Sequence, residues 1–216
     1  MKLVRLFIFD LDGTLVDTLE DITASVNYTL TKLGRQPLAM DQVRRFVGDG
    51  LTALLTRALG DRQEFLADAE GIYTVHHSRN LSVRSKLYPG VAETLEQFGS
   101  MPMAVVSNKT KDFVQPLLDN LGIGRRFRMV LGADSGLPLK PAPDALLHIM
   151  RTLGVPAEDT VMVGDGTTDI RAGKAAGIAT CAVTYGFRSE AELRQAGPDQ
   201  VIHAFGELKN FFRAQG

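Results

Sequence analysis

Short runs of β-branched and aromatic residues alternate with stretches of helical periodicity over most of this chain, and no other feature constrains its fold as strongly. Such alternation is typical of parallel strands joined by crossover helices. The sequence therefore predicts an α/β fold, with a doubly wound parallel sheet as a Rossmann-like core. Pro116 lies inside one predicted helix, where we expect a kink or a later helix start. The predicted strands are residues 3–9, 103–106, 128–131, 160–163 and 179–183, and the predicted helices are residues 91–98, 111–121, 143–153, 168–176 and 189–195.

Residues 17–81 interrupt this alternation, because they carry apolar residues at helical spacing and almost no strand signal. We expect an inserted α-helical cap domain over residues 17–81, and a catalytic core formed by residues 1–16 and 82–216. Gly34 and Gly60 stand where helix ends favour a left-handed residue. The run Gly48-Asp49-Gly50 predicts a flexible loop in the middle of the insert. The insert follows the first strand directly, so it should lie over the carboxyl edge of the sheet and open and close on short linkers.

Composition excludes several classes of partner and location. The 216 residues are 44% hydrophobic, which is enough to bury a full core, and the net charge of −1 comes from acids and bases spread along the chain. We therefore expect no binding to nucleic acid or to an acidic membrane surface. No apolar run approaches the roughly 18 residues that span a bilayer. The single cysteine, Cys181, lies in an apolar run and should be buried in the core, which is consistent with a reducing cytoplasm. We expect a soluble protein that is either a monomer or a homodimer.

Polar residues follow the predicted strands at the edge where an open parallel sheet binds its ligands. Four separate segments bring carboxylates, an ammonium group and a hydroxyl group to this one edge. These residues are Asp10, Asp12 and Gly13 after the first strand, Ser107 and Asn108 after the second, Lys140 after the third, and Asp165 and Asp169 after the fourth.

This mixture of groups suits phosphoryl transfer better than acyl or hydride transfer. A phosphoryl group in transfer carries negative charge on its equatorial oxygens, so a site needs a cation and hydrogen-bond donors around it. Asp10 and Asp165, with Asp169 as a third candidate, can bind Mg²⁺, which prefers carboxylate and water ligands. Lys140 can offset the charge on the phosphate. Asp169 could instead be a first-turn acid that the helix dipole favours.

The spacing of Asp10 and Asp12 allows one carboxylate to attack phosphorus while the other transfers a proton to the leaving oxygen. Gly13 would let the backbone approach the phosphate closely. Ser107 and the main-chain amide of Asn108 can hold the phosphate oxygens.

At these residues the sequence resembles the haloacid dehalogenase-like superfamily of phosphatases, and most closely its phosphoglycolate phosphatase group. The resemblance frames residues 3–187, and the helical insert is similar to the small cap of these enzymes. Gly166 departs from it, since many relatives carry serine there. The motifs that carry the resemblance are the runs Phe9-Asp10-Leu11-Asp12-Gly13-Thr14-Leu15-Val16-Asp17-Thr18, Ser107-Asn108-Lys109, Lys140-Pro141-Ala142-Pro143 and Gly164-Asp165-Gly166-Thr167-Thr168-Asp169-Ile170.

The resemblance implies a role for each of these residues. Asp10 would be the nucleophile and Asp12 the general acid and base. Ser107 and Lys140 would bind phosphate. Magnesium would be held by Asp10, the main-chain carbonyl of Asp12 and Asp165, while the later acid, Asp169, would support the metal site or the lysine.

The loop Val47-Gly48-Asp49-Gly50-Leu51 resembles the cap loop that contacts substrate in phosphoglycolate phosphatases, so Gly48, Asp49 and Gly50 are candidate substrate residues. The same glycines could simply join two helices. Recognition of a two-carbon acid would need a cation or an amide near this loop. Three arginines of the insert are available for this, and the sequence singles out none of them: Arg44, Arg45 and Arg57.

The leading prediction is a magnesium-dependent phosphatase for a small phosphorylated metabolite, with 2-phosphoglycolate as the first candidate substrate. A pyrophosphatase or a broad sugar-phosphate or nucleotide phosphatase stays open, because the same type of cap serves these enzymes. A receiver-type phosphorylation switch is a further alternative from another class, although it needs neither Asp12 nor the insert. The histidines match no metal-binding spacing and are expected on the surface or in packing roles: His76, His77, His148 and His203.

Overall fold

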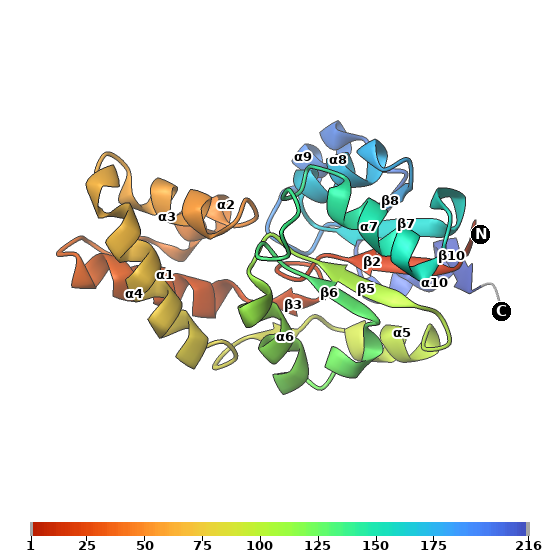
Figure 1. Cartoon of the computed structure of the whole chain (residues 1–216), viewed down its shortest axis with the longest axis horizontal. Helices are drawn as coiled ribbons and strands as arrows, with labels where there is room; N and C mark the ends of the chain where they lie inside the picture. Colours follow the sequence, from red (N-terminus) through yellow and green to blue (C-terminus); the bar gives the residue numbers. More distant parts are fainter. Residues whose placement is uncertain (1, 215–216) are drawn as a thin grey trace.

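A parallel sheet of six strands forms the centre of the larger part of the molecule, within residues 2–214, which the computed structural model describes. Figure 1 shows the sheet flanked by helices on both faces. The predicted doubly wound fold is therefore confirmed. In spatial order the strands are β6 (Met129–Leu131), β5 (Met103–Val106), β2 (Leu6–Phe9), β7 (Thr160–Gly164), β8 (Ala179–Val183) and β9 (Gln200–Ile202).

Strand β2 shows why the sheet carries helices on both faces. Its side chains alternate between two separate hydrophobic cores, with Phe7 and Phe9 in one and Leu6 and Ile8 in the other. A strand that is buried on both faces has a continuous apolar sequence, as this one does. The first core is covered by α5 (Val91–Gln97), α6 (Lys111–Asn120) and α10 (Leu208–Phe211), and the second by α7 (Asp144–Leu153) and α8 (Thr167–Ala175); α9 (Glu190–Ala196) packs beside α8.

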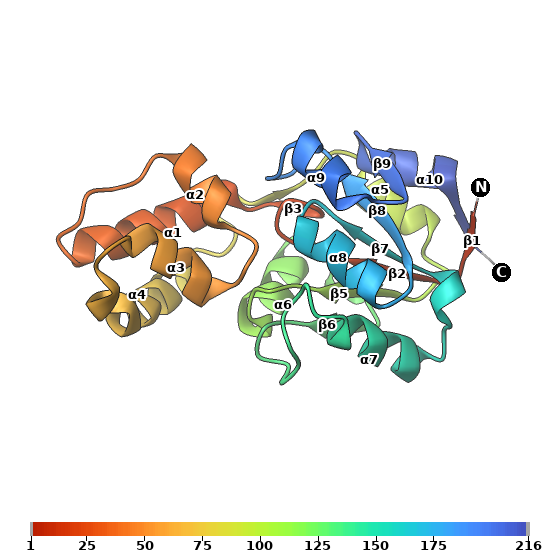
Figure 2. The ribbon, with the colours of Figure 1, turned by 90° about the horizontal axis from the view of Figure 1, so that it is seen from above.

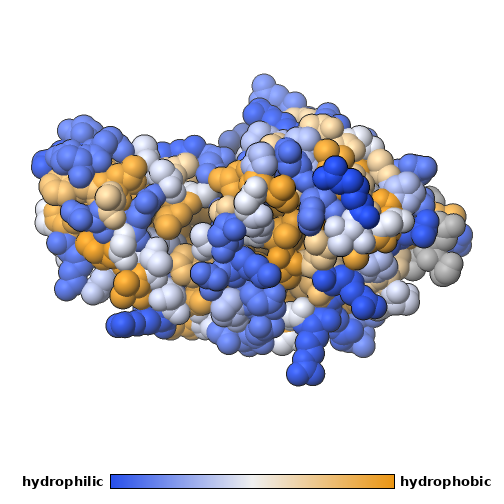
Figure 3. All heavy atoms as spheres, viewed as in Figure 1, coloured by the Kyte–Doolittle hydropathy of each residue, from blue (hydrophilic) through white to orange (hydrophobic). Residues whose placement is uncertain are grey.

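Four further helices pack together at one end of the molecule, and we call them the helical unit. They share their own hydrophobic core, in which Ile22, Val26 and Leu30 project from one face of the first helix. In the space-filling view the helical unit forms a separate lobe, and hydrophobic residues gather between it and the larger lobe (Figure 3). The four helices are α1 (Leu19–Lys32), α2 (Met40–Phe46), α3 (Leu51–Leu59) and α4 (Leu66–Arg79).

The two chain segments that connect the helical unit to the sheet run side by side. Strands β3 (Val16–Asp17) and β4 (Lys86–Leu87) form an antiparallel pair. The Asp21 carboxylate in the first turn of α1 accepts hydrogen bonds from the main-chain N–H groups of Arg84 and Ser85, at 3.0 and 2.8 Å. The segment returning from α4 is therefore held against the start of α1, and the helical unit lies at the carboxyl ends of the strands (Figure 2).

The structure differs from the sequence predictions at several points, and the short strand pair β3–β4 is one that was not predicted. The predicted strand 3–9 is two strands, because β1 (Lys2–Val4) leaves the main sheet and pairs in parallel with β10 (Phe212–Ala214). The short edge strand β9 was not predicted, although its last residue, Ile202, is buried in the first core. The prediction that the helix around Pro116 could start later was wrong, since α6 begins at Lys111 and contains the proline. Short 3₁₀ helices complete the chain at η1 (Gln63–Phe65), η2 (Gly124–Arg126), η3 (Ala157–Asp159) and η4 (Phe205–Glu207).

Two predictions about single residues can be compared with the packing. Cys181 is buried on β8, as expected, and burial raises the pKa of its thiol to about 12. His77 of α4 is also buried, and its ring lies against Tyr73 of the same helix and Phe113 of α6. Across residues 2–214, no helix combines the length and the apolar character that crossing a membrane requires.

Candidate functional site

A pocket of about 170 Å³ lies between the carboxyl ends of the central strands and the helical unit. The α/β part contributes mostly polar residues to its wall, whereas the helical unit contributes mostly apolar ones. Every predicted site residue except Gly13 lines this one pocket, and Gly13 lies directly behind one of them. The predicted residues on the wall are Asp10, Asp12, Gly48, Asp49, Gly50, Ser107, Asn108, Lys140, Asp165 and Asp169.

The loop after β2 is bound tightly to the loop after β7. The main-chain N–H of Asp10 donates to the carbonyl of Val163 at 2.9 Å, so the strand ladder extends to the first site residue. Thr14 is fully buried, and its hydroxyl accepts from the N–H of Asp165 at 3.0 Å and lies 3.1 Å from that residue's Oδ1. Thr14 lies in the first motif beside Asp12 and Gly13, but no role was predicted for it. Its contact with Asp165 spans 151 positions, which no local pattern could indicate.

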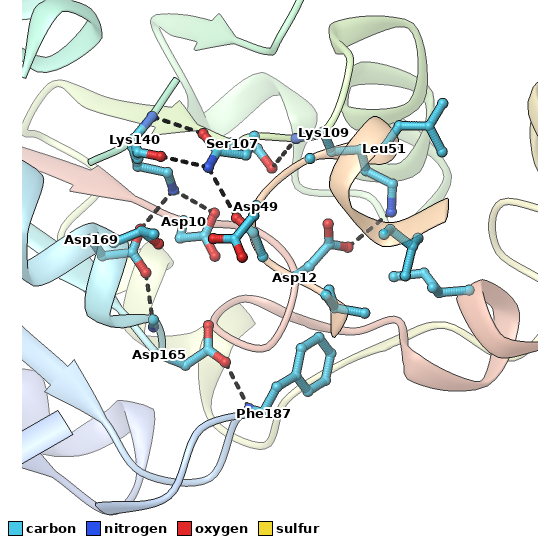
Figure 4. A pocket seen from close by; sticks show the side chains of 18 of the residues that line it. Asp10, Asp12, Asp49, Leu51, Ser107, Lys109, Lys140, Asp165, Asp169 and Phe187 are labelled. Carbon is cyan, nitrogen blue, oxygen red and sulfur yellow. Dashed lines mark hydrogen bonds and ion pairs between the residues drawn. The ribbon is translucent and has the colours of Figure 1, made fainter. Parts of the chain in front are cut away.

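Three carboxylates cluster on the α/β side of the pocket, and two of them contact a single ammonium group (Figure 4). Carboxylate oxygens of Asp10, Asp165 and Asp169 all lie within 4.8 Å of one another. The Lys140 Nζ is 2.8 Å from Asp10 Oδ1 and 2.7 Å from Asp169 Oδ1, and it also donates to the Val106 carbonyl at 2.7 Å. One lysine thus offsets part of the charge of a buried acidic cluster.

Burial and mutual repulsion shift the ionisation of these groups. Burial raises the pKa of Asp10 well above its usual value, and the charges of Asp169 and Asp165 act in the same direction, while Lys140 opposes them. Burial, together with the charge of Asp169, raises the pKa of Asp165 to about 7. Burial disfavours the charge on Lys140, but the two neighbouring carboxylates overcome this and raise its pKa. A cation among these acids would relieve the repulsion.

The donor set fits a magnesium ion. Mg²⁺ prefers hard oxygen ligands and typically takes one or two protein carboxylates together with water and phosphate oxygens. Asp10 and Asp165 offer carboxylate oxygens on the pocket wall. Asp169 is more fully engaged, because its Oδ2 accepts from the N–H of Gly166 at 2.9 Å and its Oδ1 faces Lys140.

Glycines allow the backbone to approach Asp165 closely. Gly13 has φ +86°, and a Cβ on it would lie 2.3 Å from Asp165 Oδ2. A Cβ on Gly186 would lie 2.4 Å from the same oxygen. The next residue, Phe187, donates its N–H to this oxygen at 2.7 Å. Gly186 and Phe187 were not predicted, because they lie in the loop after β8, where the sequence carries no motif.

Asp12 has a different environment from Asp10. Its Oδ1 accepts from the Thr18 hydroxyl at 2.7 Å and lies 2.9 Å from Lys109 Nζ. Figure 4 shows the Asp12 carboxylate directed towards Lys109, while the Asp10 carboxylate faces Lys140. The two acids therefore line one pocket but belong to separate ion pairs. Lys109 belongs to the Ser107-Asn108-Lys109 motif, but no role was predicted for it.

Ser107 and Asn108 lie at the carboxyl end of β5. The Ser107 hydroxyl is buried and accepts from the N–H of Lys109 at 3.2 Å. The Asn108 side chain donates to the carbonyls of Lys140 and Gly48, at 2.9 and 3.0 Å, and accepts from the N–H of Lys140 at 2.9 Å. The Asn108 side chain thus connects two loops of the α/β part with the helical unit.

The loop between α2 and α3 closes the pocket on the side of the helical unit. Gly48 and Gly50 adopt φ values of +120° and +93°, which glycine tolerates best. Asp49 between them is paired with Arg57. None of Arg44, Arg45 and Arg57 is among the residues of 2–214 that line the pocket.

Arg188, in the segment between β8 and α9, holds this loop in place. Its guanidinium donates to the carbonyl of Arg44 at 3.2 Å and to the carbonyl of Val47. It also lines the pocket, and it was not predicted. The cations on the pocket wall, within residues 2–214, thus all come from the α/β part: Lys109, Lys140 and Arg188.

A family model, curated sequences and solved structures all show similarity to one group of hydrolases. A family model described as haloacid dehalogenase-like hydrolase matches residues 7–183. Phosphoglycolate phosphatase 1 of Pseudomonas aeruginosa is 37% identical over 216 residues, covering 96% of this chain and 79% of the relative. A phosphoglycolate phosphatase of Pseudomonas fluorescens is 40% identical over 212 residues, covering 93% of this chain and 77% of the relative. The crystal structure of a predicted phosphoglycolate phosphatase from Haemophilus somnus 129PT superimposes with a TM-score of 0.91 at 30% identity, covering 96% of this chain and 97% of that one.

Proposed function

Because this chain belongs to the haloacid dehalogenase-like hydrolase family, we propose that it is a magnesium-dependent phosphatase that hydrolyses 2-phosphoglycolate through an aspartyl-phosphate on Asp10. The observation that carries this proposal is the arrangement of two acids in one pocket, each in its own ion pair. Asp10 pairs with Lys140 beside the acidic cluster, and Asp12 pairs with Lys109. Two differently placed carboxylates can divide nucleophilic attack and proton transfer between them.

Asp10 is the proposed nucleophile. Lys140 donates to its Oδ1, which leaves Oδ2 available to attack phosphorus. In the first step a bond forms between Asp10 and phosphorus while the ester bond to the leaving oxygen breaks, and Asp12 gives this oxygen its proton. In the second step Asp12 takes a proton from water, the water oxygen attacks phosphorus, and Asp10 is released together with inorganic phosphate.

The arrangement around Asp12 supports its role as the proton carrier. Thr18 and Lys109 both donate to Oδ1, and Oδ2 has no hydrogen-bond partner within residues 2–214. The free oxygen can therefore hold the proton while the other keeps the side chain in place.

The remaining polar groups are assigned to the phosphate and the metal. The phosphate oxygens would be bound by Lys140, the Ser107 hydroxyl, the N–H of Asn108 and the backbone at Gly13. Asp10, the Asp12 carbonyl and Asp165 would hold Mg²⁺, which when bound supplies positive charge to the phosphoryl oxygens. The contact of Asp169 with Lys140 favours a role in orienting that lysine.

The proposal is tested by phosphate release from a panel of substrates with purified protein and Mg²⁺. We expect a higher kcat/KM for 2-phosphoglycolate than for pyrophosphate or a hexose phosphate, and no release after chelation of the metal. Asp10→Asn should abolish turnover, and Asp12→Asn should slow it strongly. A clear preference for pyrophosphate or a hexose phosphate would overturn the substrate assignment, and a fully active Asp10→Asn protein would overturn the mechanism.

A further inference from the structure

The three cations on the pocket wall differ in how many of their donors already have acceptors. An ammonium group has three N–H donors. Lys140 lies within 2.8 Å of three oxygens, on Asp10, Asp169 and Val106, and a bound phosphate would share its donors with them. Arg188 is bound to two main-chain carbonyls of the helical unit. Lys109 contacts one acceptor, Asp12 Oδ1, within residues 2–214.

Lys109 is also poorly hydrated. Its side chain is only 9% exposed, and the pocket wall on the side of the helical unit is apolar, formed by residues such as Ile22, Leu51 and Leu54. A buried cation is costly unless it is paired and its hydrogen bonds are satisfied. The Asp12 carboxylate, which also accepts from Thr18, satisfies only part of the hydrogen-bonding capacity of Lys109. The free donors of Lys109 therefore form a site for a second anion.

The position of Lys109 tells which anion this is. Lys140 lies at the acidic cluster, where the phosphoryl group would bind, whereas Lys109 lies beside Asp12, which would protonate the leaving oxygen (Figure 4). An anion at Lys109 must therefore belong to the leaving group, a short distance beyond the ester oxygen. Asp49 in the opposite loop cannot supply it, because its carboxylate is paired with Arg57.

We propose that Lys109 determines specificity by binding a carboxylate on the leaving group of the substrate. The inference rests on the proposed phosphatase function and adds to it which substrates the site selects. A phosphomonoester with a carboxylate next to the ester carbon places one charge at Lys140 and the other at Lys109. A substrate with a neutral leaving group would leave the donors of the largely buried Lys109 side chain without acceptors, which disfavours its binding.

Lys109 could instead act only through Asp12, by orienting it. The two roles differ in a measurable way. A residue that only orients the proton carrier affects all substrates alike, whereas a residue that binds the leaving-group carboxylate affects only substrates that carry one.

The experiment compares 2-phosphoglycolate with 2-hydroxyethyl phosphate, which has a neutral hydroxymethyl group in place of the carboxylate. We measure the ratio of their kcat/KM values in the wild type, Lys109→Met and Lys109→Arg. The ratio should fall by about 100-fold in Lys109→Met, the size expected when one partner of a buried charge pair is removed. Lys109→Arg keeps the charge and should retain most of the ratio. Arg188→Met, which removes the other incompletely bonded cation, should change the ratio far less.

An unchanged ratio in Lys109→Met, with both substrates slowed equally, would overturn the proposal, as would a ratio that depends on Arg188 instead. Circular dichroism is used to check that each variant is folded. If Lys109→Met does not fold, Lys109→Gln takes its place.

Binding to the Asp10→Asn protein separates this proposal from the phosphatase assignment. Lys109→Met in that background should weaken 2-phosphoglycolate strongly and inorganic phosphate only slightly. If the wild type releases no phosphate from any substrate, the phosphatase assignment fails, while this binding difference still decides the role of Lys109. Equal weakening of both ligands would count against that role.

Discussion

Glycine residues let the backbone lie very close to the carboxylates of Asp165 and Asp169. Gly13 and Gly186 both face the Asp165 carboxylate at distances that a Cβ would not permit. A similar relation holds between Gly164 and Asp169, where a Cβ would lie 2.3 Å from Oδ2. The carboxylates that would hold or support the metal are therefore positioned by backbone that has no side chain.

Gly13→Ala tests this close approach. The substitution places a methyl group against Asp165 and adds the strain of a left-handed residue, about 1 to 2 kcal/mol. Gly34→Ala is the matched control, because Gly34 has φ +68° and no atom within 4 Å of an added Cβ. Both variants should lose stability from the left-handed strain, and Gly13→Ala should lose more because of the contact, but only Gly13→Ala should lose Mg²⁺ affinity, as measured by calorimetry. Equal Mg²⁺ affinities in the two variants would show that the contact with Asp165 is unimportant.

The raised pKa of Asp165 leads to a prediction about metal binding and pH. Burial raises this pKa to about 7, so below pH 7 the carboxyl group of the metal-free protein holds a proton that Mg²⁺ must displace. The apparent Mg²⁺ affinity should therefore fall as the pH decreases, by about tenfold per pH unit for one displaced proton. Titration calorimetry between pH 5.5 and 8.5 measures this, and Asp165→Asn should show weaker but less pH-dependent binding. A constant affinity over this range would contradict the prediction.

At the level of elements, the loop after α2 is held to the α/β part by side chains from two different segments. Asn108 donates to the Gly48 carbonyl, and Arg188 donates to the carbonyls of Arg44 and Val47. The last carbonyls of a helix have no partner within the helix and carry partial negative charge, so a guanidinium is well suited to them. Closure of the pocket thus depends on donors from the sheet side.

Arg188→Ala should loosen this closure. Hydrogen bonds to a charged group contribute about 1.5 to 3 kcal/mol, so KM should rise about tenfold or more. Amide hydrogen exchange in residues 44–51 should become faster. Arg194→Ala is the control, because Arg194 is exposed and pairs with Glu190 within α9. If exchange in residues 44–51 is the same in the two variants, Arg188 does not hold the loop.

Across the whole molecule, the hydrophobic cores of the sheet and of the helical unit are separate. The α/β part contributes Phe113 and Phe187 to the core of the helical unit. His77 is buried in that core, with Nδ1 3.0 Å from the Ser25 hydroxyl and with no partner for Nε2 within residues 2–214. Burial, with smaller effects of Lys109 and His76, lowers the pKa of His77 from 6.5 to about 2.

The helical unit should therefore be the acid-sensitive part of the molecule. Below pH 6.5 the unfolded chain binds a proton at His77 that the folded chain does not, so stability is lost as the pH falls. Between pH 7 and pH 5 the loss should be about 2 kcal/mol. Because the cores are separate, amide exchange should increase in α1–α4 before it increases in β2, β5 and β7.

His77→Asn removes the titrating group and keeps a polar partner for Ser25. Its stability at pH 7 should be lower than that of the wild type, but it should change less between pH 7 and pH 5. His203→Asn, at a side chain that is 59% exposed, should follow the wild type. A pH dependence in His77→Asn as steep as in the wild type would contradict the role of His77.

The α/β fold and the meeting of Asp10, Ser107, Lys140 and Asp165 at one pocket could be predicted from the residue pattern alone. The physical reason is that the side-chain pattern of each strand and helix is local, and that parallel strands bring their carboxyl ends to the same edge of a sheet. The polar residues that follow each strand therefore had to converge once the strands were identified.

The partners of the site residues, in contrast, become visible only in the folded molecule. Lys109 contacts Asp12 across 97 positions, Thr14 contacts Asp165 across 151, and Arg188 contacts Arg44 across 144. The pairing of β1 with β10 also joins opposite ends of the chain. No periodicity or motif encodes such pairs, because they depend on how the loops and the helical unit pack against the finished sheet.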